Sequence, residues 1–287
     1  MLQGWRTRAA LLIILGAAGY GWWNWQSAAA EPATPVKERR PPLAPEPPPE
    51  GELGDMIRLG GTLVSETSTH PLTREYVGNA LNCRSCHLEP HAAPFIGVAT
   101  AYPAWSPREQ RVVTLEDRIG NCFMRSCNGT RPPLGSRPIV AIAAYITWVS
   151  NRMPIQMNSE RAQGPYHILP LERDPKLADG KRGEILYASK CQKCHGGDGS
   201  GTTAAPPVWG NDSYNTGAGL SNNLALASWL KVAMPRPKPN LTEAEALDIA
   251  AFVNSHPRPV FRLREHLPSP DRLGEYNGEI PPDAQAP

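Results

Sequence analysis

Residues 83–87 and 191–195 carry the most specific chemistry in this sequence, because each forms a Cys-x-x-Cys-His motif. In this motif each thiol bonds a side-chain carbon of a porphyrin, and the adjacent histidine is held under the iron as its proximal ligand. A zinc site or a thioredoxin-like pair is disfavoured by the export signal described below, and disulfides leave the trailing histidine unexplained. The motifs therefore predict two covalently bound haem c groups. The attaching cysteines are Cys83, Cys86, Cys191 and Cys194, and the proximal iron ligands are His87 and His195.

The sixth iron ligand of the second haem is predicted to be Met234. Met234 precedes a proline and lies between the second motif and a terminal helix, where small cytochromes place their methionine. No other methionine follows His195, so an ordinary packing role for Met234 would leave that iron without a thioether ligand.

The sixth ligand of the first haem is less clear from the residues alone. Met153, like Met234, is followed by a proline. However, Cys122 and Cys127 are two further thiols in an exported protein, and ligation by a thiolate would explain at least one of them. A Cys122–Cys127 disulfide or a pair of buried thiols is the structural alternative. The residues leave these readings open.

The elements that must position these groups repeat along the chain, since each half has one haem motif followed by an amphipathic helix. In the second half, Thr242 and Glu245 predict a capping box for a helix ending before Pro257. In the first half, an apolar stripe predicts a helix over residues 139–146. Neither half has a strand signal. The predicted fold class is all-α, with two tandem class I cytochrome c-like domains at 53–165 and 170–265.

The flanking segments predict export. Residues 1–30 combine early arginines, an apolar run and a small-residue stretch, which is typical of either a cleaved signal sequence or a retained inner-membrane anchor. Residues 31–52 are a Pro-rich linker, and 266–287 are a Pro-rich tail predicted to lie on the surface. We therefore expect a periplasmic protein. The net charge of +2 gives no sign of a nucleic-acid partner.

Several short stretches between residues 60 and 259 form a recognisable pattern. They are Glu66-Thr67, Val77-Gly78-Asn79, Leu81-Asn82-Cys83, Tyr102-Pro103, Ser106-Pro107-Arg108, Thr114-Leu115-Glu116-Asp117-Arg118-Ile119, Asn121-Cys122-Phe123-Met124-Arg125-Ser126-Cys127-Asn128-Gly129, Trp209-Gly210, and Asn211 to Gly219. Together they resemble the di-haem thiosulfate dehydrogenases, most specifically around Cys122.

The resemblance implies that Cys122 is the sixth ligand of the first haem and that this haem is the active site. Matching family positions also imply that Arg108, Arg118 and Ser126 bind substrate. One departure bears on this reading, because Cys127 stands where the family usually has methionine. A Cys122–Cys127 disulfide would abolish ligation by Cys122.

Thiosulfate is a small dianion, so joining two of them requires strong local positive charge. Guanidinium groups hold sulfur oxyanions through paired hydrogen bonds, which suits Arg108 and Arg118 to this task. The alternative for either arginine is an ion pair with a haem propionate, Glu116 or Asp117.

The expected function is oxidation of two thiosulfate to tetrathionate, with two electrons passing through a His/Cys haem and a His/Met haem. The same site is expected to allow tetrathionate reduction. The expected acceptor is a small soluble cytochrome c or a high-potential iron–sulfur protein. Two rivals remain: a non-enzymatic di-haem electron-transfer cytochrome, and a sulfur-oxidation cytochrome that conjugates thiosulfate to a carrier cysteine.

Overall fold

The computed structural model describes residues 46–88, 94–155 and 168–268. The chain divides into residues 1–40 and residues 41–287. The predicted signal or anchor segment, most of the Pro-rich linker and residues 269–287 lie outside the described residues. Within the described ranges, no helix is long and apolar enough to cross a membrane.

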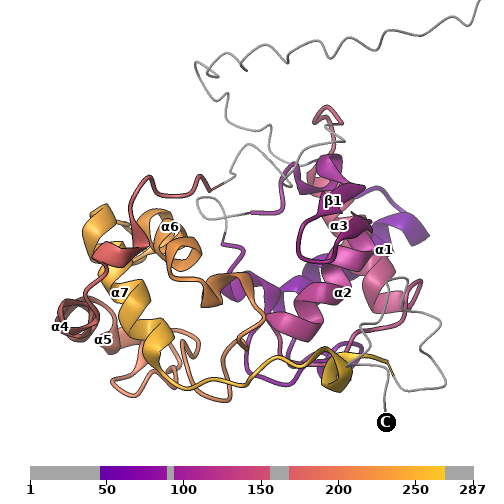
Figure 1. Cartoon of the computed structure of the whole chain (residues 1–287). Coiled ribbons are helices and arrows are strands. Elements are labelled where there is room, and N and C mark those ends of the chain that lie inside the picture. The colour runs from indigo at the N-terminus through magenta and orange to yellow at the C-terminus, as the bar shows by residue number, and fades with distance from the viewer. Residues whose placement is uncertain (1–45, 89–93, 156–167, 269–287) are drawn as a thin grey trace, which may run out of the picture. The chain divides into compact units, whose positions relative to one another are not determined.

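The first half is built on a crossing of two helices, α1 and α3, which are visible in Figure 1. A Cβ at Gly60 of α1 would lie 2.0 Å from the backbone oxygen of Ala141 in α3, so the two helices touch where no larger residue fits. The α-helices and strands are α1 (Glu52–Ser65), β1 (Ala104–Ser106), β2 (Arg111–Val113), α2 (Leu115–Arg125) and α3 (Arg137–Val149).

The second half repeats this crossing with α4 and α7. A Cβ at Gly183 of α4 would lie 2.1 Å from the backbone oxygen of Asp248 in α7. The same glycine-mediated contact in both halves supports the internal duplication read from the sequence. The α-helices are α4 (Gly180–Lys190), α5 (Gln192–His195), α6 (Asn223–Ala233) and α7 (Glu243–Ser255). Short 3-10 turns, η1 to η6, connect the elements.

The two terminal helices of the halves form where their sequence signals predict them. Thr242 and Glu245 form the predicted capping box at the start of α7, and the helix ends two residues before Pro257. In the first half, α3 buries the predicted stripe of Ile139, Ile142 and Ile146. Each half packs its own apolar cluster, and α1, α2 and α3 contribute to the first one.

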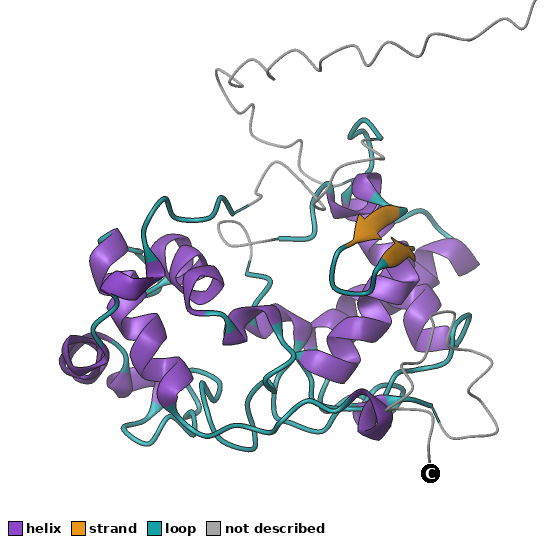
Figure 2. Cartoon of the chain, viewed as in Figure 1, coloured by secondary structure: helices purple, strands orange, loops and turns teal. Residues whose placement is uncertain are grey.

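A small antiparallel ribbon in the first half departs from the expectation that strands are absent. β1 pairs with β2 in the register Ala104 to Val113, Trp105 to Val112 and Ser106 to Arg111 (Figure 2). Strands this short carry too few residues to show an alternating pattern in the sequence. The turn between the two strands carries Arg108 and Glu109.

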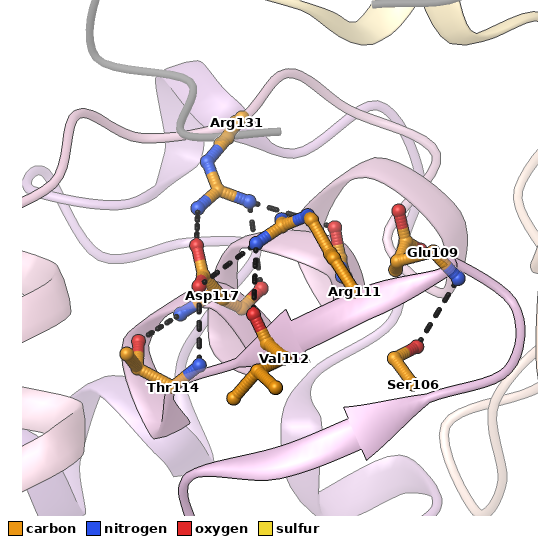
Figure 3. Close-up of polar contacts among 8 residues, drawn as sticks. Ser106, Glu109, Arg111, Val112, Thr114, Asp117 and Arg131 are labelled. Atoms are coloured by element: carbon orange, nitrogen blue, oxygen red, sulfur yellow. Dashed lines mark hydrogen bonds and ion pairs between the residues drawn. The ribbon is translucent and has the colours of Figure 1, made fainter. Parts of the chain in front are cut away.

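The start of α2 is fixed by a buried ionic network around Asp117 (Figure 3). Asp117 is fully buried; its Oδ1 lies 2.6 Å from Nη2 of Arg131, and its Oδ2 lies 3.2 Å from Nη1 of Arg111. Asp117 also accepts a hydrogen bond from the backbone N–H of Thr114, which closes a capping box. Residues of the ribbon, of α2 and of the following loop are therefore held together at one carboxylate.

The segment that follows α7 packs against the far end of α2. Leu267 and Phe261 contact Met124 of α2 in one apolar cluster. Nδ1 of His266 donates a hydrogen bond to the Gly129 carbonyl 2.7 Å away, and the His266 carbonyl accepts a hydrogen bond from the N–H of Arg131. His266 and Leu267 open the predicted surface tail, yet both are buried in the structure. This segment therefore supports the helix that carries Cys122.

Candidate functional site

The first haem motif opens onto a cavity of about 60 Å³ in the first half. Cys83, Cys86 and His87 line it, and so do three residues from the end of α2, namely Cys122, Ser126 and Cys127. The structure thus brings together the predicted attaching residues, the predicted sixth ligand and one predicted substrate-binding residue.

The walls of this cavity fit a porphyrin. Phe95 stacks on the His87 ring with centroids 4.3 Å apart, and Ile142 and Ile146 of α3 supply aliphatic wall. Burial raises the pKa of the Cys83 thiol to about 11 and that of Cys86 to about 12, because an apolar surrounding disfavours the thiolate. Two thiols, an imidazole and an apolar wall are the donor set and surroundings that haem c requires.

The second motif opens onto a larger cavity, of about 400 Å³. Cys191, Cys194 and His195 line it together with Met234, which caps α6. Nδ1 of His195 lies 2.8 Å from the Pro206 carbonyl oxygen. A neutral imidazole donates through Nδ1 in this contact, which leaves the lone pair of Nε2 for a metal. These residues also fit haem c, with Met234 on the same cavity as the predicted proximal histidine.

The placement of the three candidate sixth ligands in the first half differs. Cys122 and Cys127 line the cavity, whereas Met153 is absent from the described residues that line it. Both cysteines are free thiols, so the structure contains no Cys122–Cys127 disulfide. Cys127 is buried, and desolvation raises its pKa well above the ordinary value. Ligation of an iron by Cys122 stays a prediction. The position of Cys122 on the same cavity as His87 agrees with that prediction.

One face of α2 collects the predicted site residues. Arg118, Cys122 and Ser126 follow one another at spacings of four residues, which places them in line along a helix. Ser126 is the C-cap of α2, and its carbonyl accepts a hydrogen bond from Nδ2 of Asn79 at 2.8 Å. Ile119 and Phe123 of α2 line the cavity together with Cys122 and Ser126, whereas Arg118 is not among the described residues that line it.

Arg118 is the second predicted substrate-binding residue of α2 whose surroundings the structure describes. Its side chain is exposed to solvent, yet desolvation by the surrounding protein still acts to lower its pKa. The charge of Cys122 outweighs this effect and raises the pKa of Arg118. Asp117, one of its two predicted acidic alternatives, forms ion pairs with Arg111 and Arg131.

Arg108 reaches this region from the turn of the β-ribbon. Its Nη1 donates a hydrogen bond to the Gly217 carbonyl at 3.0 Å, a contact between residues 109 positions apart. The pKa of Arg108 is lowered by desolvation and then by the positive charges of Arg125 and Arg118. The charges of Arg125 and Arg118 therefore act on Arg108, and the negative charges of Glu109 and Cys122 oppose them.

Arg125 and Glu109 belong to the same cluster and were not predicted from the sequence. Nη2 of Arg125 lies 3.1 Å from Oε1 of Glu109, and both side chains are largely buried. A helical-periodicity argument identifies Arg125, since it follows Cys122 by three residues on the same face. Glu109 has no such signal, because only folding of the ribbon places it beside α2.

The two cavities share part of their walls. Leu81, Asn82 and Cys86 line both. Trp229 of α6 lines the second cavity, and its Nε1 donates a hydrogen bond to the Cys86 carbonyl at 2.9 Å. A direct contact therefore joins the backbone of one haem motif to the wall of the other site.

Two family profiles match the chain. The profile described as SoxA/TsdA, cytochrome c domain, matches residues 75–155. The profile described as cytochrome c oxidase, cbb3-type, subunit III, matches residues 178–253. The chain therefore has two tandem cytochrome c domains in a mostly helical fold, which confirms the predicted fold class.

Individual proteins match over most of the chain. The thiosulfate dehydrogenase of Allochromatium vinosum is 41% identical over 229 residues, covering 75% of this chain and 82% of that protein. That of Stutzerimonas stutzeri is 35% identical over 230 residues, covering 75% and 73%.

A solved structure also matches the fold. It is the thiosulfate dehydrogenase (TsdBA) of Marichromatium purpuratum in its as-isolated form, with a TM-score of 0.68 and 35% identity. The match covers 74% of this chain and 48% of that one, so this chain spans about half the length of that structure's chain.

Proposed function

The chain belongs to the thiosulfate dehydrogenase family, and on this premise we propose that it oxidises two thiosulfate to tetrathionate. One observation carries the proposal: Arg118, Cys122 and Ser126 share a face of α2, and Cys122 and Ser126 line the same cavity as His87. A cytochrome that only transfers electrons needs a haem and its ligands. Electron transfer alone does not require a further thiol in the haem cavity or a cluster of arginines near it.

The two cavities would hold two covalent haem c groups. Cys83 and Cys86 would attach the first, and Cys191 and Cys194 the second. Each bound haem supplies a one-electron acceptor, so the pair accounts for the two electrons that the reaction releases. The first would be ligated by His87 and Cys122, and the second by His195 and Met234.

Arg108 and Arg118 would hold the sulfonate oxygens of thiosulfate. Their mutual repulsion shows how much positive charge this small volume already carries, and a bound dianion relieves that repulsion. Ser126 would add a hydroxyl donor at the cavity wall. Binding in this position leaves the outer sulfur of thiosulfate toward Cys122.

Cys122 would then form the first sulfur–sulfur bond. Its thiolate and the outer sulfur of thiosulfate lose two electrons together and form a cysteine S-thiosulfonate. The outer sulfur of a second thiosulfate attacks the thiosulfonate sulfur. This attack forms the central bond of tetrathionate, breaks the bond to Cys122 and returns the thiolate, so atoms and charges balance.

The second domain would be the exit for electrons. A small soluble cytochrome c or a high-potential iron–sulfur protein would accept electrons there, in the periplasm. The inner membrane would hold the protein if residues 1–30 are retained. The residues that bind and oxidise thiosulfate would also reduce tetrathionate when electrons enter through the second domain.

The decisive experiment is the assay of purified holoprotein with thiosulfate and ferricyanide, followed by analysis of the sulfur products. We expect free tetrathionate, with one tetrathionate formed per two ferricyanide reduced. Absence of thiosulfate oxidation would favour the pure electron-transfer rival. Consumption of thiosulfate only when a carrier protein thiol is added would favour the conjugating cytochrome.

Variants at the two cavity cysteines test the chemistry. Cys122→Met should keep a ligated, folded haem, because a thioether can occupy an axial position, but activity should nearly vanish. Cys127→Ser is the matched control and should stay largely active. Magnetic resonance of the oxidised wild type should contain a low-spin His/thiolate signal and a His/Met signal. An inactive Cys127→Ser protein with an active Cys122→Met protein would move the chemistry to the other thiol.

A further inference from the structure

Arg125 stands beside the proposed thiosulfate site without a role in binding the first thiosulfate. It lies on the same face of α2 as Cys122 and Arg118, one turn beyond Cys122. Its guanidinium is fixed on two sides: Nη2 contacts Glu109 on the ribbon turn, and the ring of Phe261 lies 4.2 Å from its central carbon. Two elements outside α2 thus hold this side chain in place.

The Nε–H of Arg125 is a buried donor that has no hydrogen-bond partner among the described residues. The side chain as a whole is only 13% exposed. A buried N–H without a partner is costly, and this cost is highest for a charged group. The Nε–H of Arg125 therefore keeps a hydrogen-bonding capacity that none of the described residues uses.

The total charge of two bound thiosulfate ions also favours a third arginine at the site. Two thiosulfate dianions bring four negative charges to one recess, whereas Arg108 and Arg118 together supply two positive charges. Arg125 is close enough to Arg108 to depress the pKa of that guanidinium. Arg108 is therefore electrostatically coupled both to Arg118, near the start of α2, and to Arg125, at its end.

We propose that Arg125 binds the sulfonate group of the second thiosulfate, and with it one end of tetrathionate. This inference rests on the proposed function and assigns the two ends of the product to different arginines. Arg108 and Arg118 hold the first sulfonate beside Cys122. Arg125 holds the second, so that the outer sulfur of the incoming thiosulfate points along α2 toward the thiosulfonate.

Glu109 has a restraining role in this arrangement. Its carboxylate occupies one of the five N–H donors of Arg125 and orients the fork, but it also places a negative charge near the anion. Glu109→Gln keeps an oxygen acceptor and removes that charge. The proposal therefore predicts opposite effects from the two partners of one ion pair: loss of Arg125 weakens anion binding, and neutralising Glu109 strengthens it.

The test is titration calorimetry of tetrathionate into the fully oxidised holoprotein, with every protein compared carrying Cys122→Met, so that no Cys122 thiolate can exchange with tetrathionate and no electrons are available for its reduction. Arg125→Gln should weaken tetrathionate binding by about ten- to a hundredfold, the usual effect of losing a charge-assisted hydrogen bond. Arg125→Lys should recover only part of this, because it keeps the charge but loses Nε–H. Glu109→Gln should tighten binding by about two- to fivefold.

Two comparisons make the result specific. Sulfate, which has no second sulfonate, should bind Arg125→Gln about as well as the wild type but bind Arg118→Gln more weakly. Arg58→Gln removes an arginine that is ion-paired on the exposed surface of the same half, and it should leave tetrathionate binding unchanged. Haem content and far-UV circular dichroism check that each variant is folded.

Three outcomes would overturn the proposal. The first is unchanged tetrathionate binding in Arg125→Gln. The second is equal weakening in Arg125→Gln and Glu109→Gln, which would make the pair purely structural. The third is equal loss of sulfate and tetrathionate binding in Arg125→Gln, which would place Arg125 in the first sulfonate site. If the wild type neither oxidises thiosulfate nor binds tetrathionate, the proposed function itself fails.

Discussion

Replacing Asp117 by asparagine should strongly destabilise the first domain. The Asp117 carboxylate faces Arg131 on one oxygen and Arg111 on the other, at 2.6 and 3.2 Å. Asp117 and Arg131 each have side chains only 1% exposed, so water cannot replace the lost partner. Asparagine is nearly the same shape but carries no charge, so it removes the carboxylate that faces the buried Arg131 cation at 2.6 Å.

The magnitude follows from that burial. Breaking a buried ion pair by removing one partner costs about 3–5 kcal/mol. For a chain of this size the melting temperature should fall by about 6–20 °C, since each kcal/mol lowers it by about 2–4 °C. Arg111 is 17% exposed and can regain some hydration, so its share of the loss is the smaller one. The measurement is thermal and guanidinium chloride unfolding, followed by far-UV circular dichroism.

The matched control is Asp55→Asn. Asp55 forms an ion pair with Arg58 in α1, but their side chains are 74% and 50% exposed, so the expected loss is below about 1 kcal/mol. A loss in Asp117→Asn no larger than that of Asp55→Asn would refute the view that the Asp117 network holds α2. The double variant Asp117→Asn with Arg131→Met should recover part of the loss, because it removes the buried charge as well.

Three further predictions address the other levels of the structure. Gly183→Ala should cost about 1–3 kcal/mol or more, because its Cβ would overlap the backbone of α7, whereas Gly180→Ala meets no atom within 4 Å and should be neutral in the same thermal unfolding assay. The hydrogen bond from Lys190 lowers the pKa of Glu245 from 4.5 to about 2, so this carboxylate stabilises the fold above its unfolded pKa and the benefit is lost as pH falls from about 4.5 to about 2. Glu245→Gln should therefore lower the free energy of unfolding at neutral pH by less than about 1 kcal/mol, because the pair is partly exposed, and should match the wild type below that window. A pyridine haemochrome assay should count two haem c groups per chain, and a count of one would contradict the assignment of both motifs.

The sequence alone was sufficient for features whose cause is local. A Cys-x-x-Cys-His motif carries its attaching thiols and proximal ligand within five residues, so no knowledge of the fold is needed to find them. The capping box of Thr242 and Glu245 is equally local, because it joins side chains and backbone groups three residues apart. The tandem repeat followed from having these signals twice in the same order.

The sixth iron ligands needed both the sequence and the tertiary structure. The place of Met234 in the sequence predicted a ligand for the second haem, and the structure puts it on the cavity lined by His195. For the first haem, spacing alone left Cys122, Cys127 and Met153 in competition. The fold separates them, because α2 carries the two cysteines to the cavity wall and Met153 is not among the described residues there.

Only the tertiary structure decided the composition of the anion site. Arg108 meets Gly217, and Arg125 stacks on Phe261, across more than a hundred residues of sequence. Glu109 reaches Arg125 because a three-residue ribbon turns back on itself, and strands that short leave no periodic signal. Such contacts depend on how two domains and a terminal segment pack around α2, and packing is a property of the folded chain rather than of any local run of residues.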